Sequence, residues 1–362
     1  MNVAGIDAHA TYLVVAIVSK AGDLLHAPMR ITNKNASKLL ALLERFRPIE
    51  AVVETSPAWP WLYDMLTGHG FGFVLAHAKR LRIIAESNYK RDEIDAELLA
   101  RMRLAGLIPY VHPKDIETRE QATLIRHRER LTRLRTGAAS RIHAELHSVG
   151  LYLGRGRLLT RAGRRWVREH AWPVFGPEQQ RLVRTHWVLI RTLSSMIQRL
   201  DRRIERVGAE LPAVALLRTI PGIGPYRGLL IATEVLPIER FSTPAKLVGY
   251  AGLAPRSARS GLRPTRTGHI PAGANRRLRN AFVQGVVSHL KHAPDSWLSR
   301  YYEAHKKRLG WQTARVATAR KLARATHAML RTGEVWRDES DTPSGERSEL
   351  QGTHVAPTTS VS

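Results

Sequence analysis

Apolar residues in the first third of the chain follow two periods, and each period predicts a different kind of element. Short runs of β-branched and aromatic residues predict strands over 2–7, 12–18, 24–31, 50–54 and 71–76. Apolar residues that recur every three to four positions predict helices over 37–46, 61–67, 79–87 and 91–105. Three strands followed by alternating helices and strands predict a mixed sheet flanked by helices, an α/β domain.

The middle of the chain has a helical period throughout. Apolar residues alternate in steps of three and four at Ile190, Leu193, Ile197, Leu200, Ile204, Val207 and Leu211. This heptad spacing predicts a coiled coil, and a second long basic helix is predicted over 117–149. The two helices could form a hairpin that only separates two domains, or a stalk that dimerises and touches phosphates. We favour dimerisation, because an isolated heptad face leaves its seam exposed.

The last part of the chain is predicted to be mostly helical. Residues 216–233 read as helix, tight loop and helix, and the loop contains Gly222 and Gly224. It resembles a helix-hairpin-helix motif, in which glycines let backbone N–H groups approach a phosphate; the alternative is a helix pair that only packs. Further helices are predicted over 283–331, where we expect the Trp and Tyr side chains to close a core rather than stack on bases.

Composition limits the class of protein. The 362 residues are 43% hydrophobic and include no cysteine, which excludes disulfides and thiolate metal sites and fits a cytoplasmic protein. The first residues lack the pattern of a signal peptide, and no uncharged apolar run is long enough to span a membrane. The histidines show no zinc-binding spacing.

Charge is concentrated in two parts of the chain. The formal net charge is +26, but residues 1–113 hold 13 basic and 11 acidic side chains, whereas residues 255–331 hold 17 and 2. This distribution favours catalysis in the first part and binding of a nucleic acid, not a membrane, in the rest. We therefore predict four regions: an α/β domain 1–113, a basic helical region 114–211, a C-terminal domain 212–336 and a disordered tail 337–362.

Four carboxylates form the first candidate site. Asp92 and Asp95 stand three apart in KRDEIDAELLARM, so a helix would carry both on one face. Asp7 and Glu54 each end an apolar strand. Carboxylates brought together repel by about 4 kcal/mol per close pair at an effective dielectric near 20. A divalent metal would turn this repulsion into binding, and Mg²⁺ prefers such hard oxygen ligands.

A second candidate site lies in the arginine-rich segment 256–282. Its Gly, Ser, Thr and Pro residues predict a loop that faces phosphates. The expected nucleic-acid contacts are Lys90, Arg91, Arg256, Arg259, Arg263, Arg266, Arg276, Arg277 and Arg279, together with Gly222 and Gly224. Judged from the residues alone, Ser257 and Ser260 would only donate hydrogen bonds to phosphates, because no activating base or metal is evident nearby.

Several strings together resemble a known family. GIDAH, VVETS and KRDEIDAELLA, followed by GYAGLAP, SG, GHI and NRRLR, resemble the DEDD-type insertion-sequence transposases of the one-ten group. The resemblance implies a ribonuclease-H-like domain similar to RuvC, with the acid tetrad on Asp7, Glu54, Asp92 and Asp95. It places the family's serine on Ser260. Arg91 departs from the pattern, since a threonine is usual there, as do Pro271 and Ala272, where Thr-Lys is usual.

The resemblance also implies a mechanism and partners. Ser260 would attack a DNA phosphate bound at one or two Mg²⁺ ions and form a covalent phosphoserine, so that strands are rejoined without ATP. A structured guide (bridge) RNA and a homo-oligomer, dimer or tetramer, are implied as well. We predict a DNA transposase or recombinase. The alternatives are a hydrolytic endonuclease like the junction resolvases, which would not need Ser260, and a non-catalytic nucleic-acid-binding protein.

Overall fold

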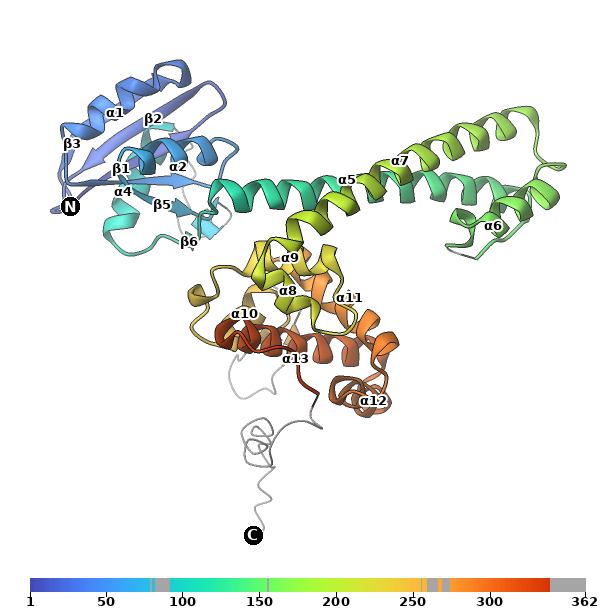
Figure 1. Cartoon of the computed structure of the whole chain (residues 1–362). Coiled ribbons are helices and arrows are strands. Elements are labelled where there is room, and N and C mark those ends of the chain that lie inside the picture. The colour runs from blue at the N-terminus through green and yellow to red at the C-terminus, as the bar shows by residue number, and fades with distance from the viewer. Residues whose placement is uncertain are drawn as a thin grey trace, which may run out of the picture. The chain divides into compact units, whose positions relative to one another are not determined.

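The computed structural model describes residues 1–78, 80–81, 92–154, 156–254, 256–258, 266–268 and 274–338; for residues 92–94, 256–258 and 266–268 only the backbone is described. The chain divides into two compact units, Met1–Glu117 and Thr118–Ser362 (Figure 1). Most of the predicted helix 79–87 and the tail from residue 339 onward lie outside the described residues.

The first unit is built on one six-stranded sheet. Its strands are β1 (Asn2–Ala8), β2 (Tyr12–Val18), β3 (Leu24–Thr32), β4 (Ile49–Glu54), β5 (Gly72–Ala76) and β6 (Tyr110–Val111). They lie in the order β3-β2-β1-β4-β5-β6. The strands β1, β4 and β5 are parallel, whereas β2, β3 and β6 pair antiparallel with their neighbours. The predicted mixed sheet is confirmed.

Helices cover both faces of this sheet. They are η1 (Asn33–Asn35), α1 (Ala36–Glu44), α2 (Trp59–Gly68) and α4 (Asp92–Leu104). Because side chains alternate along a strand, Ile6 and Val53 join the core formed with α1 and α2, whereas Val3 and Val52 pack with α4. The strand β6 was not predicted, because two residues are too few to show alternation.

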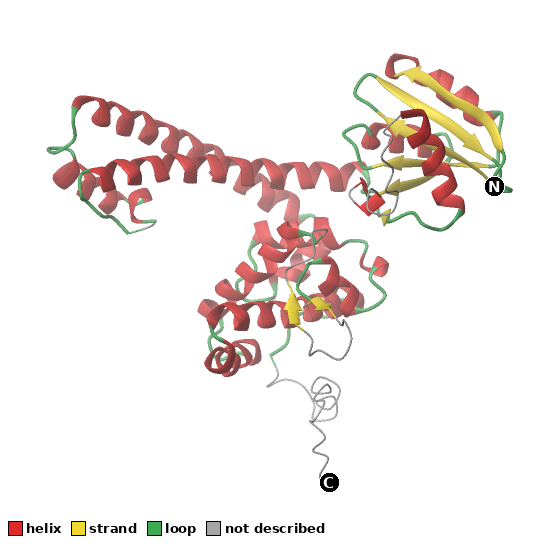
Figure 2. Cartoon of the chain, turned by 180° about the vertical axis from the view of Figure 1, so that it is seen from behind, coloured by secondary structure: helices red, strands yellow, loops and turns green. Residues whose placement is uncertain are grey.

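The second unit begins with a long antiparallel helical hairpin. Its arms are α5 (Ile116–Ser148) and α7 (Pro177–Ala209), each 33 residues and so about 50 Å long. They are joined through η2 (Arg157–Leu159), α6 (Arg161–Trp166) and η3 (Val167–Ala171). Arg128 pairs with Asp201 at 2.8 Å, and Gln179 donates to Glu145 at 3.0 Å, so the arms lie side by side (Figure 2).

The heptad seam of α7 is covered within the chain. Ile190, Ile197 and Ile204, each seven residues after the last, are buried at 5%, 3% and 1% exposure. Ile190 packs in one core with Ile142 of α5. Our expectation that the seam lies open for a second copy was therefore wrong, because whether a partner helix lies in the same chain is not encoded in the heptad itself.

The rest of the second unit is a helical body around its own core. Its elements are α8 (Pro212–Arg218), α9 (Pro225–Val235), η4 (Ile238–Arg240), α10 (Pro244–Tyr250), β7 (Arg256–Ala258), β8 (Arg266–Gly268), α11 (Arg276–His292), α12 (Trp297–Leu309) and α13 (Trp311–Thr332). Phe282 of α11 is fully buried at its centre. Trp297 packs against this core and Tyr302 is buried, as expected, whereas Trp311 is 53% exposed.

The segment 256–282, predicted to be a loop before its helix, contains two short paired strands. Ser257 of β7 lies opposite Thr267 of β8 (Figure 2). Three-residue strands are too short to be recognised by period, and the pairing between them stabilises them. No helix among the described residues is long and apolar enough to cross a membrane.

Candidate functional site

Asp7 and Glu54 occupy equivalent positions on neighbouring strands. The parallel register of β1 and β4 ends with Ile6 opposite Val53, so the two acids are the next residue of each strand. A Cβ placed on Gly5 would overlap the backbone of Ala96 in α4. Asp7, two residues after Gly5, belongs to the same face of the sheet. The alternation of β4 likewise assigns Glu54 to the face where Val52 packs with α4.

The first turn of α4 brings further acids to this end of the sheet. Ala96 packs against Val14 of β2, and Val14 lies opposite Asp7 in the register of β1 and β2. Asp95 directly precedes Ala96 and is half-buried. Asp92 begins the helix, but its side chain lies outside the described residues. The strand end that carries Asp7 is thus next to the helix end that carries Asp92 and Asp95, whereas Glu54 ends the neighbouring strand on the same face of the sheet.

His9 contacts the first of these carboxylates and was not recognised from the sequence. Its Nε2 lies 2.9 Å from Oδ2 of Asp7, and its ring stacks on Tyr12 with centroids 4.5 Å apart. The guanidinium of Arg30 lies 3.5 Å from the centre of the Tyr12 ring. The only sequence signal was a histidine two residues after the acid in GIDAH. In the fold, this stack holds the Asp7 carboxylate in place.

The donor chemistry of this face suits a hard divalent cation. Carboxylate oxygens are the ligands that Mg²⁺ prefers. Among the residues whose side chains the structure describes, no three His, Asp or Glu lie close enough together to hold a metal ion. Asp7, Glu54 and Asp95 are among these residues, whereas the side chain of Asp92 is not.

The segment that carries Ser260 lies in the sequence between two strands that pair with each other. Ser260, Arg259 and Arg263 lie outside the described residues, as do Lys90 and Arg91, and of Arg256 and Arg266 only the backbone is described. In the sequence, 259–265 connects β7 to β8, and these strands pair from Arg256 opposite Gly268 to Ala258 opposite Arg266.

Asn275 joins the two flanks of this segment. Its Nδ2 donates to Oε2 of Glu234 at 2.8 Å and lies 3.2 Å from the hydroxyl of Tyr250. Its Oδ1 accepts from the backbone N–H of Leu278 and so caps α11. Glu234 is only 6% exposed. The end of α10 and the start of α11 are thereby held together at the base of the serine segment.

The three arginines of NRRLR have different surroundings. Arg276 is exposed. Arg277 pairs with Glu129 of α5 at 2.8 Å, and the hydroxyl of Tyr226 donates to the same carboxylate at 3.0 Å. Burial, together with Glu129, raises the pKa of Tyr226 above its usual range. Arg279 donates to the carbonyl oxygen of Gly252, and burial lowers its pKa. Of the three, Arg276 is the one with its side chain open to solvent.

The two glycines of the tight loop also differ. Gly222 has φ +85°, and a Cβ there would lie 2.6 Å from the backbone nitrogen of His289 in α11. Its lack of a side chain therefore serves packing between protein segments. Gly224 precedes Pro225 at the start of α9, and a Cβ there would meet open space. Gly224 is the glycine at which a phosphate could approach the helix end.

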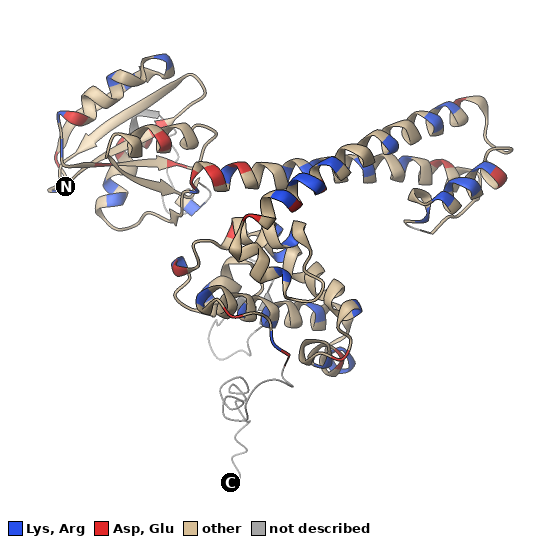
Figure 3. Ribbon diagram, in the orientation of Figure 1, with Lys and Arg blue, Asp and Glu red and all other residues tan. Residues whose placement is uncertain are grey.

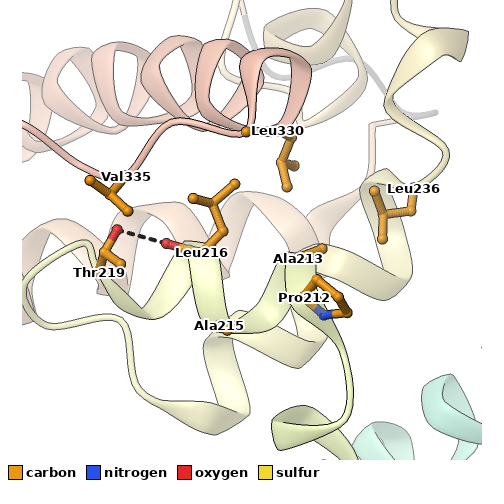
Figure 4. Close-up of a pocket in the computed structure, with 9 residues that line it drawn as sticks. Pro212, Ala213, Ala215, Leu216, Thr219, Leu236, Leu330 and Val335 are labelled. Carbon is orange, nitrogen blue, oxygen red and sulfur yellow. Dashed lines mark hydrogen bonds between the residues drawn. The ribbon is translucent and has the colours of Figure 1, made fainter.

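A cavity lies elsewhere in the second unit, between α8 and α13 (Figure 4). Its volume is about 540 Å³ and its lining is mostly aliphatic, including Leu216, Leu236 and Leu330. The hydroxyl of Thr219 is already engaged, donating to the carbonyl oxygen of Leu216 and accepting from the N–H of Trp336. No described residue lining this cavity carries a charge, so it does not suit phosphate chemistry.

Comparison with known proteins gives matches over both units. A family model of DEDD-type IS110 transposases matches residues 4–150, and the model described as Transposase IS116/IS110/IS902 family matches residues 214–303. The chain is 27% identical over 288 residues to the transposase for insertion sequence element IS1111A of Coxiella burnetii, covering 76% of each chain.

Two further relatives cover slightly more of the chain. The transposase for insertion sequence element IS1328 of Yersinia enterocolitica is 24% identical, over 82% of this chain and 91% of the relative. The putative transposase y4rJ of Sinorhizobium fredii is 28% identical, over 82% of this chain and 81% of the relative. The two family models include Asp7, Glu54, Asp92 and Asp95 in one match and Ser260 in the other.

Proposed function

We propose a function for this chain, which belongs to the IS116/IS110/IS902 transposase family and is a DNA transposase. The proposal is that it cleaves and rejoins DNA with four carboxylates and a serine. The observation that carries the proposal is the equivalent placement of Asp7 and Glu54 on adjacent parallel strands, on the sheet face that packs against α4, whose first turn bears Asp92 and Asp95. The strand order and these positions support a ribonuclease-H-like, RuvC-like domain.

Asp7, Glu54, Asp92 and Asp95 would hold one or two Mg²⁺ ions. The bound cation would neutralise charge on the scissile phosphate. The chain's own part is to fix the ligands: β1 and β4 set the spacing of two carboxylates, and His9 restrains Asp7 through the 2.9 Å contact. Close packing of the α4 backbone on Gly5 fixes the helix that carries the other two acids against the sheet.

Ser260 is the proposed nucleophile. A bond forms between its Oγ and the DNA phosphorus and the bond from phosphorus to the leaving sugar oxygen breaks; the serine proton passes to solvent, and the leaving oxygen takes up a proton from solvent to become a hydroxyl. The resulting phosphodiester conserves the energy of the broken one, so rejoining needs only the reverse attack. The nearby arginines, with Arg276 as the described exposed member, would stabilise negative charge in the transition state.

A guide RNA and a homo-oligomer are the proposed partners besides DNA. The strongly basic helices of the second unit support a second polyanion, because arginines line both arms of the hairpin (Figure 3). Leu189 and Met196, seven residues apart on α7, are 46% and 47% exposed, as is Leu134 of α5 at 55%. These apolar side chains outside the covered seam support pairing of two hairpins.

One substitution with a matched control tests the carboxylate site. Asp95→Asn keeps the side-chain volume and removes a charged ligand, so we expect Mg²⁺-dependent strand cleavage to fall at least 100-fold while DNA binding survives. Glu97→Gln makes the same chemical change one half-turn away, where the carboxylate pairs with Arg101 at 2.7 Å, and should cleave normally. Near-normal cleavage by both Asp95→Asn and Asp92→Asn would refute the metal-site proposal.

A further inference from the structure

Arginine and aromatic side chains are concentrated at the end of the hairpin where the chain turns from α5 into α7. Residues 150–187 contain eight arginines, no lysine and only two glutamates. Figure 3 shows this basic end of the hairpin, around α6. It contains none of the proposed carboxylates and is remote in sequence from Ser260. Neither cleavage chemistry nor the helical packing of the arms requires such a composition.

Two tryptophans and two arginines line a cavity in this region. The cavity has a volume of about 450 Å³, is open to solvent and is lined by Arg168, Trp172, Arg184 and Trp187; this volume is within the usual size range of small-ligand sites. The Trp172 and Trp187 rings are nearly parallel, at 17°, with centroids 6.3 Å apart. The guanidinium of Arg184 lies 5.0 Å from the centre of the Trp172 ring. Planar faces and cationic groups thus converge on one space.

The arginines that line the cavity differ from their neighbours. Arg165 pairs with Glu169 at 2.7 Å, and Arg181 lies 3.4 Å from Glu178. Arg168 and Arg184 are exposed and form no ion pair with any described carboxylate. Glu169 attracts Arg168 but pairs with Arg165, so both exposed guanidinium groups remain available to an anionic ligand.

The wall of the cavity is held rigidly. The side-chain amide of Gln180 donates to the carbonyl oxygens of Trp172 and Phe175, each at 3.1 Å. Both tryptophans pack on the buried core that includes Val167 and Val183, yet each stays partly open. One side of each ring thus belongs to the core while the remainder lines the cavity, so the binding surface is formed before a ligand arrives.

We propose that this cavity binds an unpaired nucleobase and its flanking phosphate, in a single-stranded segment of nucleic acid. Any base can stack on an indole face, and arginine both stacks on planar groups and binds phosphate. A base inside a duplex has both faces covered by its neighbours, so a duplex cannot fill the site. RNA and DNA share this chemistry. The proposal rests on the family's handling of nucleic acid, but not on Ser260 or the carboxylates.

Binding by the full chain in EDTA tests the proposal without cleavage. The probes are a fluorescent 12-nucleotide oligo(U), the matching oligo(dT) and a 12-base-pair duplex. Because base stacking on an aromatic residue contributes about 1–3 kcal/mol, Trp172→Leu should weaken binding of at least one single strand about 5- to 150-fold and leave duplex binding within about twofold. Arg184→Gln should act in the same direction, and as an exposed side chain it tests the site even if Trp172→Leu fails to fold.

Arg181→Gln is the matched control, because it removes the same charge one turn away on the same helix, outside the cavity. We expect it to weaken single-strand binding no more than about twofold. Equal losses for Arg181→Gln and Arg184→Gln, or unchanged single-strand binding by Trp172→Leu, would overturn the proposal.

Photocrosslinking locates the bound base directly. Oligonucleotides carrying 5-iodouracil, as RNA in one arm and DNA in the other, are irradiated with the wild-type chain, and the modified peptide is identified by mass spectrometry. An adduct on Trp172 or Trp187 supports the site, and the arm that gives it identifies RNA or single-stranded DNA as the source. Adducts confined to peptides outside 150–187 in both arms would overturn it.

Discussion

His289 is fully buried between the loop at Pro221 and the start of α12. Its Nδ1 donates to the carbonyl oxygen of Pro221 at 2.9 Å, and its Nε2 accepts from the hydroxyl of Ser296 at 2.7 Å. Both partners suit a neutral imidazole, and burial lowers the pKa of His289. One side chain thus ties the loop that contains Gly222 and Gly224 to the helical body.

This burial predicts a pH-dependent stability. In the unfolded chain His289 has a pKa of about 6.5, above its value in the fold, so the stability it contributes is complete above about pH 6.5 and is lost as the pH falls through the folded pKa. We expect the free energy of unfolding, from urea titrations at pH 7.5 and 5.5, to fall more for the wild type than for His289→Gln. His170→Gln, at an exposed histidine in the hairpin, should keep the wild-type dependence. Identical losses in all three proteins would contradict this role.

Single residues of this kind could not be found from the sequence. Asp7 and Glu54 were predicted because each ends an apolar strand, and the acids of α4 because their spacing sets one helical face. His9 and His289 stand in no local pattern, and Asn275 was noted only as the first residue of NRRLR. Glu234 and Pro221, the partners of Asn275 and His289, are distant in sequence, and only the fold brings them to these side chains.

At the scale of elements, the hydrogen bonds of Asn275 to Glu234 and Tyr250, here called the clamp, have the most direct consequence for chemistry. They lie at the base of the segment that carries Ser260. Asn275→Asp keeps the cap on α11 but replaces the donor to Glu234 with a second acceptor. We expect cleavage to fall at least tenfold while DNA binding changes less than threefold, because the flanks of the segment no longer hold together.

A compensating substitution separates this effect from unfolding. Glu234→Gln on the Asn275→Asp background restores a donor–acceptor pair, so cleavage should recover in the double variant. The contradicting outcome is that the single variant loses cleavage and the double variant does not regain it, while circular dichroism shows that both are folded. The clamp would then not position the serine.

Elements differed in how well the sequence predicted them. The long periodic helix α5 was predicted close to both of its observed ends, and α7 close to its C-terminal end. Many residues contribute to the pattern of such long segments. The hairpin of β7 and β8 was not, since three residues carry too little pattern and the pairing comes from the partner strand. Likewise, the helix that covers a heptad face is set by the tertiary fold.

Across the whole molecule, charge is divided between a nearly neutral first unit and a basic second one. The basic side chains of residues 255–331, 17 against 2 acidic ones, predict binding to duplex DNA that weakens with salt. The logarithm of the affinity should fall with the logarithm of salt concentration by about 0.9 per phosphate neutralised.

Neighbouring arginines sharpen this prediction. Arg276→Gln should reduce the salt slope by about one, because Arg276 is exposed. Arg277→Gln should lower stability and leave the slope nearly unchanged, because Arg277 pairs with Glu129. A slope that responds only to Arg277→Gln would show that this ion pair opens on DNA. A flat response of the wild type would mean that these arginines do not bind phosphate.

The central claim is that strands are exchanged through a covalent link between DNA and Ser260. The most direct measurement incubates the full chain with Mg²⁺, the RNA transcribed from the non-coding DNA flanking its gene, and labelled substrate DNA, then separates the products under denaturing conditions. The wild type and Ser257→Ala should form a protein–DNA adduct that survives denaturation, and Ser260→Ala should form none. Cleaved DNA without any adduct from the wild type would identify water as the nucleophile and contradict the account.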